Sequence, residues 1–575
     1  MRLRGLAIMC AAVLALAACA SIPDSGPVNE GDADVSPVEP LVPIQEGPNP
    51  GDDPEAIVRG FLTASAGGVA TDFSVAREFL TEEAAAQWDP TVQTLVYDSG
   101  TVTPDWDEPS RTVTYEVPLA SAVDESGRRV DAAGDEVARL EFTVALDDDD
   151  QWRISRLEDG VLLTQANFDR FFRPVDLVFA TADRTTIVPE LRWLPDNNVA
   201  TSAARELIEG PSTWLADAVL TGFPATAALA VESVVVSGGV ATVDLTVQSA
   251  GTADERALAE EQMRQTLTGL PSVTDVDVRI GGLPIAGDGS IALATAPVPE
   301  ETAAAIVNDQ LGMWDGEDLF VGPLASGGLG EGSYGVAMAY DGGTVAFVRG
   351  GSALVTTPSL GAAGTVLVEA TSGLGEPTGL LEAQTVRTGD ALVSPSYDRH
   401  GYLWTAERTG AGGLVAVAPD GTSVELASEW LQTRSVIGLS VSRDDARLAV
   451  ISRSGGQPAV ELAAIVRDAD GAPLSLGEPI SAGAGVGAGV DVVWVDDTTV
   501  GVLGEPLDGS PSPLWLVQVG GGTSTILSVR QAVDMAVRSG ESTVLVVAAD
   551  GTVEERSGSS WAPVTQGVAE LAYSG

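Results

Sequence analysis

A short sequence unit recurs through the second half of this chain, and it restricts the possible fold more than any other feature. Each copy consists of an apolar segment, an acidic or glycine-containing turn and a second apolar segment, repeated at roughly 45 to 55 residues. The turns lie at residues 341–343, 398–401, 444–445, 496–497 and 539–541. Four-stranded blades of a β-propeller need this spacing, and a ring of blades leaves only short strand edges. The repeats therefore predict an all-β propeller over residues 306–575, with two stacked β-sandwiches as the alternative.

The number of blades is left open by the repeats. Residues 314–323, ahead of the first copy, have the composition of further strands. They are expected either to complete another blade or to close the ring together with the C-terminal blade.

Helical and strand patterns occur together between residues 179 and 290. Thr252 and Glu255 form a capping box that opens a helix. The apolar side chains on the inner side of this helix are Ala259, Met263, Leu267 and Leu270. The other expected elements are a helix at 203–208 and strands at 231–236, 240–247 and 273–280. These patterns predict a compact α/β domain with helices packed on a sheet.

Residues 54–178 begin with helical patterns and continue with strand patterns. Asp53-Pro54-Glu55 is typical of a helix start, and residues 73–88 form a second helical pattern. The strand patterns are at 113–119, 137–146 and 152–163. Helices followed by a largely antiparallel set of strands predict an α+β domain.

The N-terminus has the features of a bacterial lipoprotein signal. Arg2 and Arg4 give a positive start, and residues 6–16 form an apolar stretch too short to span a bilayer. Leu16-Ala17-Ala18-Cys19 then supplies a cleavage site with cysteine at the cut. Residues 1–18 are therefore expected to be removed, and the Cys19 thiol to carry a lipid that anchors the chain on the extracytoplasmic face of the cell membrane. An ordinary secretory signal with a coincidental cysteine is the alternative.

Residues 19–53 are rich in proline, glycine and acidic side chains, which predicts an extended spacer. At ~3.3 Å per residue, this spacer places the first domain up to ~100 Å from the lipid.

Composition excludes several classes of function. The chain carries 82 acidic and 30 basic residues, a formal net charge of −52. A nucleic-acid partner is not expected, because phosphate binding needs a basic face. Cys10 lies in the segment to be removed, so the mature chain has one, lipidated cysteine and neither a disulfide nor a zinc site is expected. A histidine-dependent triad would have to form around the single histidine, His400, which is expected to be a solvated turn residue.

Some patterns resemble functional motifs but are expected to be structural. Asp147–Asp150 suggests calcium, but Trp152 stands where an EF-hand needs glycine, so a hairpin turn is predicted. Residues 330–335 match G-x-G-x-x-G but enter a strand, which argues against a dinucleotide site. The tryptophans predicted to be core aromatics are Trp88, Trp106, Trp152, Trp193 and Trp214. No catalytic, cofactor-binding or metal-ligating residue is predicted, although the many carboxylates leave a glycosidase open.

The segment Cys19-Ala20-Ser21-Ile22-Pro23-Asp24-Ser25-Gly26-Pro27-Val28, together with the three predicted domains, resembles the actinobacterial LpqB lipoprotein family. The middle domain is similar to the GerMN domain. The motifs that carry this similarity are Leu207-Ile208-Glu209-Gly210-Pro211, Thr221-Gly222-Phe223-Pro224 and Gly239-Val240-Ala241-Thr242-Val243-Asp244-Leu245.

The resemblance implies a non-enzymatic accessory protein of the MtrA–MtrB two-component system. Such a protein contacts the extracytoplasmic domain of the sensor histidine kinase MtrB and influences cell-wall homeostasis and division. No catalytic residues come with the family. A lipoprotein that binds or hydrolyses cell-wall glycan is the alternative of a different class.

Overall fold

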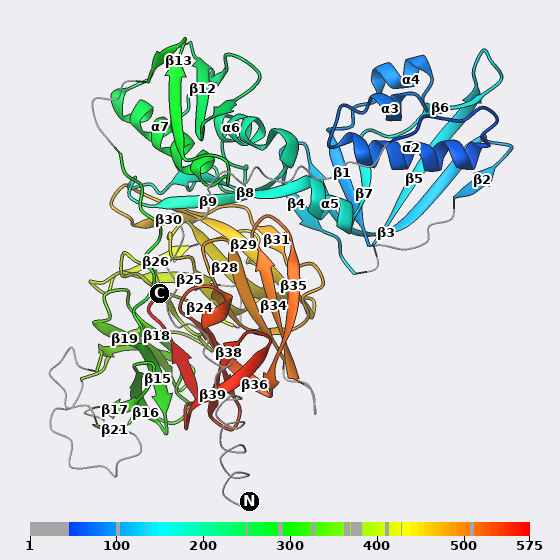
Figure 1. The fold of residues 1–575 in the computed structure, drawn as a ribbon. Coiled ribbons are helices and arrows are strands. Elements are labelled where there is room, and N and C mark those ends of the chain that lie inside the picture. The colour runs from blue at the N-terminus through cyan, green and yellow to red at the C-terminus, as the bar shows by residue number, and fades with distance from the viewer. Residues whose placement is uncertain are drawn as a thin grey trace, which may run out of the picture. The chain divides into compact units, whose positions relative to one another are not determined.

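The computed structural model describes residues 45–98, 104–134, 136–248, 251–285, 291–322, 324, 328–360, 368–369, 382–408, 413–426, 428–505 and 511–575. These residues lie within one compact unit, Ile44–Gly575 (Figure 1). Among the helices of this part of the chain, none combines the length and apolar character needed to cross a membrane. Cys19 and the predicted signal segment lie outside the described residues.

The N-terminal domain consists of helices packed on a sheet, which confirms the predicted α+β class. Helix α2 (Pro54–Gly68) is capped by Asp53, whose carboxylate accepts the Ala56 N–H at 2.8 Å. Its apolar face packs against the sheet (Figure 1). The strands are β1 (Gln93–Tyr97), β2 (Asp105–Asp107), β3 (Thr112–Asp124), β4 (Arg129–Asp131), β5 (Val137–Leu146), β6 (Trp152–Arg156) and β7 (Val161–Thr164). Their main order is β6-β5-β3-β1-β7, and helix α5 (Gln165–Phe171) follows.

Two predicted elements of this domain are interrupted. The continuous helix predicted over 73–88 is wrong, because it divides into α3 (Ser74–Arg77) and α4 (Glu82–Gln87). Between these helices Leu80 makes a β-bridge to Ile154, and the Thr81 hydroxyl then caps α4. The predicted strand 152–163 likewise divides into β6 and β7, which are separated by a turn.

The middle domain places two helices against a small sheet, which confirms the predicted α/β arrangement. Strands β12 (Val240–Thr246) and β13 (Asp275–Ile280) are parallel, and α7 (Ala253–Thr268) connects them (Figure 1). The capping box at Thr252 is present. The four apolar side chains predicted on the inner side of the helix are buried, but the helix ends at Thr268 and Leu270 lies just beyond it. The other elements are β8 (Phe172–Ala180), β9 (Ile187–Pro195), η2 (Asp196–Asn198), α6 (Val199–Glu209), β10 (Ala228–Leu229), β11 (Val235–Ser237) and β14 (Leu283–Pro284).

The strand predicted at 231–236 is mostly wrong, since only β11 joins the sheet there. The Val234 N–H instead donates to the Thr201 hydroxyl of α6 at 3.0 Å. This bond holds the preceding segment against the helix, and the Val231 and Val235 side chains remain 63% and 61% exposed.

The C-terminal half forms six sheets over its described residues. Five of these sheets are each formed by strands in chain order, and the first strand of each is the innermost. The first two sheets are β18 (Tyr334–Met338), β19 (Thr344–Arg349), β20 (Ala353–Pro358) and β22 (Gln384–Thr388), and β23 (Ser396–Tyr397), β24 (Leu403–Ala406), β25 (Leu414–Val417) and β26 (Ser423–Leu426). The next three are β27 (Ser435–Val441), β28 (Arg447–Ser454), β29 (Gln457–Arg467), β30 (Pro473–Leu476) and β31 (Ile480–Ala482); β32 (Gly489–Trp494), β33 (Thr499–Gly504), β34 (Pro511–Gln518) and β35 (Thr523–Arg530); and β36 (Ala532–Val537), β37 (Val544–Ala548), β38 (Thr552–Ser557) and β39 (Ser560–Gln566).

The remaining sheet closes the ring. It joins β15 (Ala303–Val307), β16 (Gln310–Trp314), β17 (Leu319–Gly322) and β21 (Val368–Glu369) to the C-terminal strand β40 (Glu570–Ala572). The innermost strands β40, β18, β23, β27, β32 and β36 contact one another in this order, and β36 returns to β40. The predicted propeller is therefore confirmed, with residues 314 and 319–322 in strands of the closing blade, and the alternative of two sandwiches is wrong.

Candidate functional site

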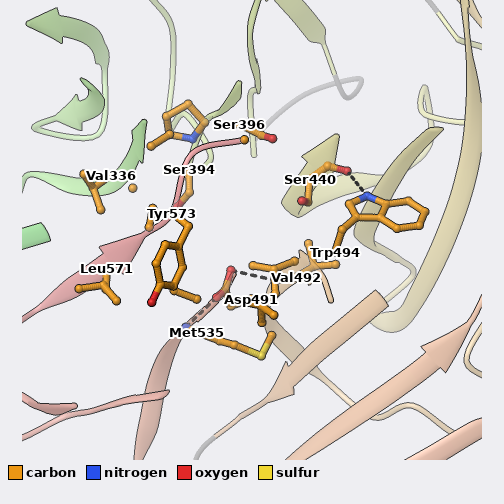
Figure 2. A pocket seen from close by; sticks show the side chains of 18 of the residues that line it. Val336, Ser394, Ser396, Ser440, Asp491, Val492, Trp494, Met535, Leu571 and Tyr573 are labelled. Atoms are coloured by element: carbon orange, nitrogen blue, oxygen red, sulfur yellow. Dashed lines mark hydrogen bonds between the residues drawn. The ribbon is translucent and has the colours of Figure 1, made fainter. Parts of the chain in front are cut away.

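The innermost strands enclose a channel on the propeller axis with a volume of about 100 Å³. Its lining includes the acids Asp491, Asp534 and Glu570. Figure 2 shows the Asp491 carboxylate directed at the backbone of Val492 and Met535. Cavities that bind small molecules usually measure ~300–1,000 Å³, so the channel is small for such a ligand.

Each of these acids accepts hydrogen bonds from the backbone of the next blade. The pairs are Asp491 Oδ2 with the Met535 N–H at 3.0 Å, Asp534 Oδ2 with the Leu571 N–H at 2.9 Å, and Glu570 Oε2 with the Val336 N–H at 3.1 Å. Glu570 also accepts the N–H of Gly335. The carboxylates therefore join neighbouring blades, and this role explains acids at a buried position.

The other joints between blades use different groups. The Ser396 hydroxyl accepts the Val441 N–H at 3.1 Å, and the Trp494 indole N–H donates to the Ser440 carbonyl at 3.1 Å (Figure 2). At Gly335, where φ is +71°, a Cβ atom would lie 2.8 Å from the Ser394 Cα. This close approach and the positive φ both favour glycine at that joint.

Burial changes the protonation of the channel acids. Loss of water raises the pKa of Asp491 to about 6 and that of Glu570 to about 7. The pKa of Asp534 rises further, because the Asp491 and Glu570 carboxylates add like charge to the effect of burial. At these three positions the folded protein therefore binds more protons than the unfolded chain between about pH 4 and pH 7, and their contribution to stability falls as the pH rises through this range.

Asp534→Asn should raise stability at pH 7.5 by about 1–3 kcal/mol and leave it nearly unchanged at pH 4.5. The amide oxygen can still accept the Leu571 N–H, but the side chain no longer has to take up a proton when it is buried on folding. Urea unfolding of the mature protein at both pH values measures this difference.

Asp550→Asn is the matched control for this prediction. Asp550 is an exposed turn residue that accepts the Thr552 N–H at 3.0 Å, and that bond lowers its pKa. The control should therefore give no gain at pH 7.5. An Asp534→Asn variant that is less stable than the wild type at pH 7.5 would contradict the prediction.

A second polar cluster connects the middle domain to the propeller. Arg399 donates to Asp183 at 2.9 Å, and its Nε atom lies 2.7 Å from the Asp445 carboxylate. Burial alone would raise the pKa of Asp183, but the Thr181 and Thr185 hydroxyls and Arg399 lower it to about 2. Asp183 is therefore charged at neutral pH, and the contact holds the β8–β9 turn against the propeller.

His400 belongs to this cluster, so the prediction of a solvated turn residue is wrong. It does stand in a turn, because the Gly401 N–H donates to the Asp398 carbonyl. However, its side chain is only 22% exposed, and its ring packs on Gly471. Burial lowers the pKa of His400, and Arg399 and Arg467 lower it further. The imidazole is therefore neutral at pH 7 and has a packing role.

Arg447 forms the most buried connection between these two domains. Its guanidinium pairs with Asp444, and both side chains are 1% exposed. It also donates to the Pro189 carbonyl of β9 at 3.2 Å and lies 4.8 Å from the centre of the Trp494 ring. A single apolar core continues across this boundary, since it includes residues of α6, α7, β28, β29 and β33. The middle domain and the propeller therefore form one packed body.

A glycine turn between β34 and β35 brings all three domains together. The Gly522 N–H donates to Asp131 of β4 at 3.0 Å, and the Trp193 indole donates to the Gly520 carbonyl at 3.2 Å. At Gly521, where φ is +91°, a Cβ atom would lie 2.4 Å from the Arg129 carbonyl oxygen. Only glycine allows this approach without a backbone shift.

The same junction borders a cavity of about 530 Å³, which we call the three-domain cleft. Its lining residues are Arg128–Asp131, Ala133, Glu136, Glu190, Leu191, Trp214, Pro458–Val460, Leu462, Ile480–Val486 and Gln518–Gly521. This volume falls within the range of ligand-binding cavities, which often lie between domains. Sequence reasoning missed this cleft.

The other predicted site residues have the following positions. Cys19, the predicted lipidation site, is outside the described residues. In the Asp147–Asp150 turn, Asp147 accepts the N–H groups of Asp149 and Gln151 at 3.0 and 2.9 Å, which confirms the hairpin turn. Residues 330–335 lead into strand β18, as predicted. Within the described parts of the chain, no group of three or more His, Cys, Asp or Glu side chains is placed to hold a metal ion.

The tryptophans have the packing role that the sequence suggested. All eleven are buried or half-buried, including the five predicted to be core aromatics. A glycan-binding surface usually presents exposed aromatic rings, and the tryptophans provide none.

Close packing in the middle domain explains the glycine of the Thr221-Gly222-Phe223-Pro224 motif. The Gly222 N–H donates to Gln262 Oε1 of α7 at 2.8 Å. A Cβ atom at Gly222 would lie 2.2 Å from the backbone nitrogen of Ala259. Glycine is thus needed where this segment crosses the helix.

The domains match known families. The model for the lipoprotein LpqB N-terminal domain matches residues 47–169, and the model named Germane, for sporulation and spore germination, matches residues 174–286. The model for the lipoprotein LpqB beta-propeller domain matches residues 321–572. An α+β domain, a Germane domain and a six-bladed propeller define a three-domain propeller protein.

Whole-chain comparison agrees with this order of domains. Lipoprotein LpqB of Cutibacterium acnes is 26% identical, and the alignment spans 98% of this chain and 98% of that protein. Lipoprotein LpqB of Thermobifida fusca is 34% identical, and the alignment spans 48% of this chain and 45% of that protein. A structure of tandem GerMN domains of GerM from Bacillus subtilis is 21% identical over 25% of this chain and 58% of its own, with a TM-score of 0.18. The chain belongs to the lipoprotein LpqB family.

Proposed function

We propose that this protein is a lipid-anchored accessory regulator on the extracytoplasmic face of the cell membrane. It binds the extracytoplasmic domain of a sensor histidine kinase of the MtrB type and thereby adjusts two-component signalling in cell-wall homeostasis and division. The anchor is the lipid on Cys19, and the part of the predicted spacer that precedes the compact unit, residues 19–43, gives the folded part its reach.

The joining of three domains into one compact unit is the observation that carries this proposal. A binding protein gains affinity when its surface is organised before the partner arrives. The Arg399–Asp183 bond, the Arg447 contacts and the glycine turn at 520–522 provide such organisation by fixing the domains to one another.

The channel supports a binding role over an enzymatic one. Its acids accept backbone hydrogen bonds between blades, and they are therefore poorly placed to act as a general acid and base. A glycan-hydrolysing protein remains the second candidate because carboxylates do line the channel. Incubation of the purified protein with cell-wall polysaccharide fragments is expected to leave the fragments unchanged, and their conversion would favour this second candidate.

The proposal is tested by capture of the mature protein on the immobilised extracytoplasmic domain of the organism's own MtrB-type kinase. Specific capture is expected, and the extracytoplasmic domain of an unrelated sensor kinase is the control. Equal capture on both domains, or none on either, would overturn the proposal.

Whether kinase binding needs the domains held in this relative position can be tested in the same capture assay with two glycine variants. Gly521→Ala should weaken capture, because its Cβ atom would meet the Arg129 carbonyl and displace the N-terminal domain. Gly540→Ala is the matched control: its φ of +76° is also positive, but its Cβ atom would meet nothing within 4 Å. Equal capture by the two variants would show that the relative position of the domains does not matter for binding.

A further inference from the structure

We infer that the three-domain cleft is the docking site for an extended, apolar stretch of a partner polypeptide that also carries an acidic residue. This inference rests on the proposed function, since it assigns the binding of a protein partner to a particular place. Among the described residues, three kinds of group that line the cleft support the inference: apolar side chains, unbonded backbone amides and a free cation.

Part of the cleft lining is apolar. Val460, Leu462 and Ile480 come from the outer strands of one propeller blade, and Trp214 comes from the middle domain. Val130 of β4 also lines the cleft, and it is 60% exposed. An apolar side chain that stays this exposed in the folded protein gains most from a partner that covers it.

The segment 483–485, which lines the cleft, presents backbone groups that are not covered by large side chains. Gly483 and Gly485 have positive φ values of +64° and +84°, and a Cβ atom at Gly485 would meet nothing within 4 Å. Among the described residues, the amide groups of Ala484 and Gly485 have no hydrogen-bond acceptor. Free backbone donors beside an apolar surface are what an extended peptide uses, because its carbonyl groups need partners.

The charges around the cleft leave one cation without a partner. Arg129 pairs with Asp131 at 3.4 Å, and Glu190 pairs with Arg192 at 3.1 Å. Glu136 accepts the Ala133 N–H at 3.3 Å. Within the described part of the chain, Arg128 has no ion pair or side-chain hydrogen bond. In a protein with 82 acidic and 30 basic residues, a free guanidinium at a cleft favours a partner with an acidic group there.

The test measures the dissociation constant between the mature protein and the extracytoplasmic domain of the MtrB-type kinase. Val130→Asp should weaken binding about tenfold or more, since it places an unpaired charge in an apolar contact. Arg128→Glu should weaken binding by more than Arg128→Ala does, because it adds repulsion to the loss of attraction. Leu474→Asp is the matched control: Leu474 is 59% exposed on β30 of the same propeller blade and does not line the cleft.

All four variants change exposed or half-buried side chains, and equal thermal unfolding midpoints would show that they fold. If the wild type binds the kinase domain and the Val130 and Arg128 variants bind equally well, the cleft is not the contact, although the proposed function stands. If the wild type does not bind the kinase domain, both proposals fall. If sedimentation shows that the wild type self-associates and Val130→Asp abolishes this, a second copy fills the cleft and the inference is wrong.

Discussion

Replacing Arg447 by methionine should lower the free energy of unfolding by about 3–5 kcal/mol. The guanidinium lies between the middle domain and the propeller, and its side chain is 1% exposed. Methionine fills a similar volume but leaves the Asp444 carboxylate buried without its cation. Urea unfolding followed by tryptophan fluorescence measures the change, because Trp494 lies directly beside the guanidinium.

Two further variants separate the buried charge from general loss of packing. Arg453→Met removes a surface ion pair with Glu505, in which the side chains are 39% and 52% exposed, and should cost less than about 1 kcal/mol. Adding Asp444→Asn to Arg447→Met should recover part of the lost stability, since the orphaned charge is then gone. The prediction fails if Arg447→Met is no more destabilising than Arg453→Met.

Short sequence patterns predicted the elements that are stabilised by hydrogen bonds between residues close together in the chain. The capping box at Thr252 and the Asp147 turn each depend on residues within four positions of one another. The propeller was predictable for a related reason, because each copy of the repeat forms a hairpin around its own turn. In all of these cases the interacting residues are neighbours along the chain.

Contacts between domains could not be predicted in this way. Arg399 and Asp183 are 216 positions apart, and Asp131 and Thr523 are 392 positions apart. No periodicity links such residues, since each pair joins elements of different domains. His400 was misjudged for the same reason, because its turn was visible in the sequence but the surface that covers it was not.

The channel acids did leave a signal in the sequence. Asp491 and Asp534 stand at equivalent positions in two consecutive copies of the repeat, ahead of the turns at 496–497 and 539–541. An acid that recurs on an otherwise apolar innermost strand indicates a polar contact that each blade makes with the next. This signal predicts a joint between blades, which differs from the paired acids of a glycosidase that the sequence had left open.

Replacing Cys19 by serine should move the protein from the membrane fraction to the soluble fraction almost completely. A serine hydroxyl cannot form the thioether to lipid, and each methylene that is no longer buried removes ~0.8 kcal/mol of membrane affinity. The proposed removal of residues 1–18 takes away Arg2 and Arg4 and brings the net charge from −52 to −54, so an anionic membrane surface should repel the remainder.

Cys10→Ser is the matched control for this prediction, because Cys10 lies in the segment that we propose is removed, and its loss should leave the protein on the membrane. Fractionation of cells followed by a high-salt wash distinguishes the two variants. The Cys19→Ser protein should retain the unfolding midpoint of the wild type, since the folded domains lie beyond the spacer. Retention of this variant on the membrane after the wash would mean that a contact other than the lipid holds the protein there, and the anchoring step of the proposed function would be wrong.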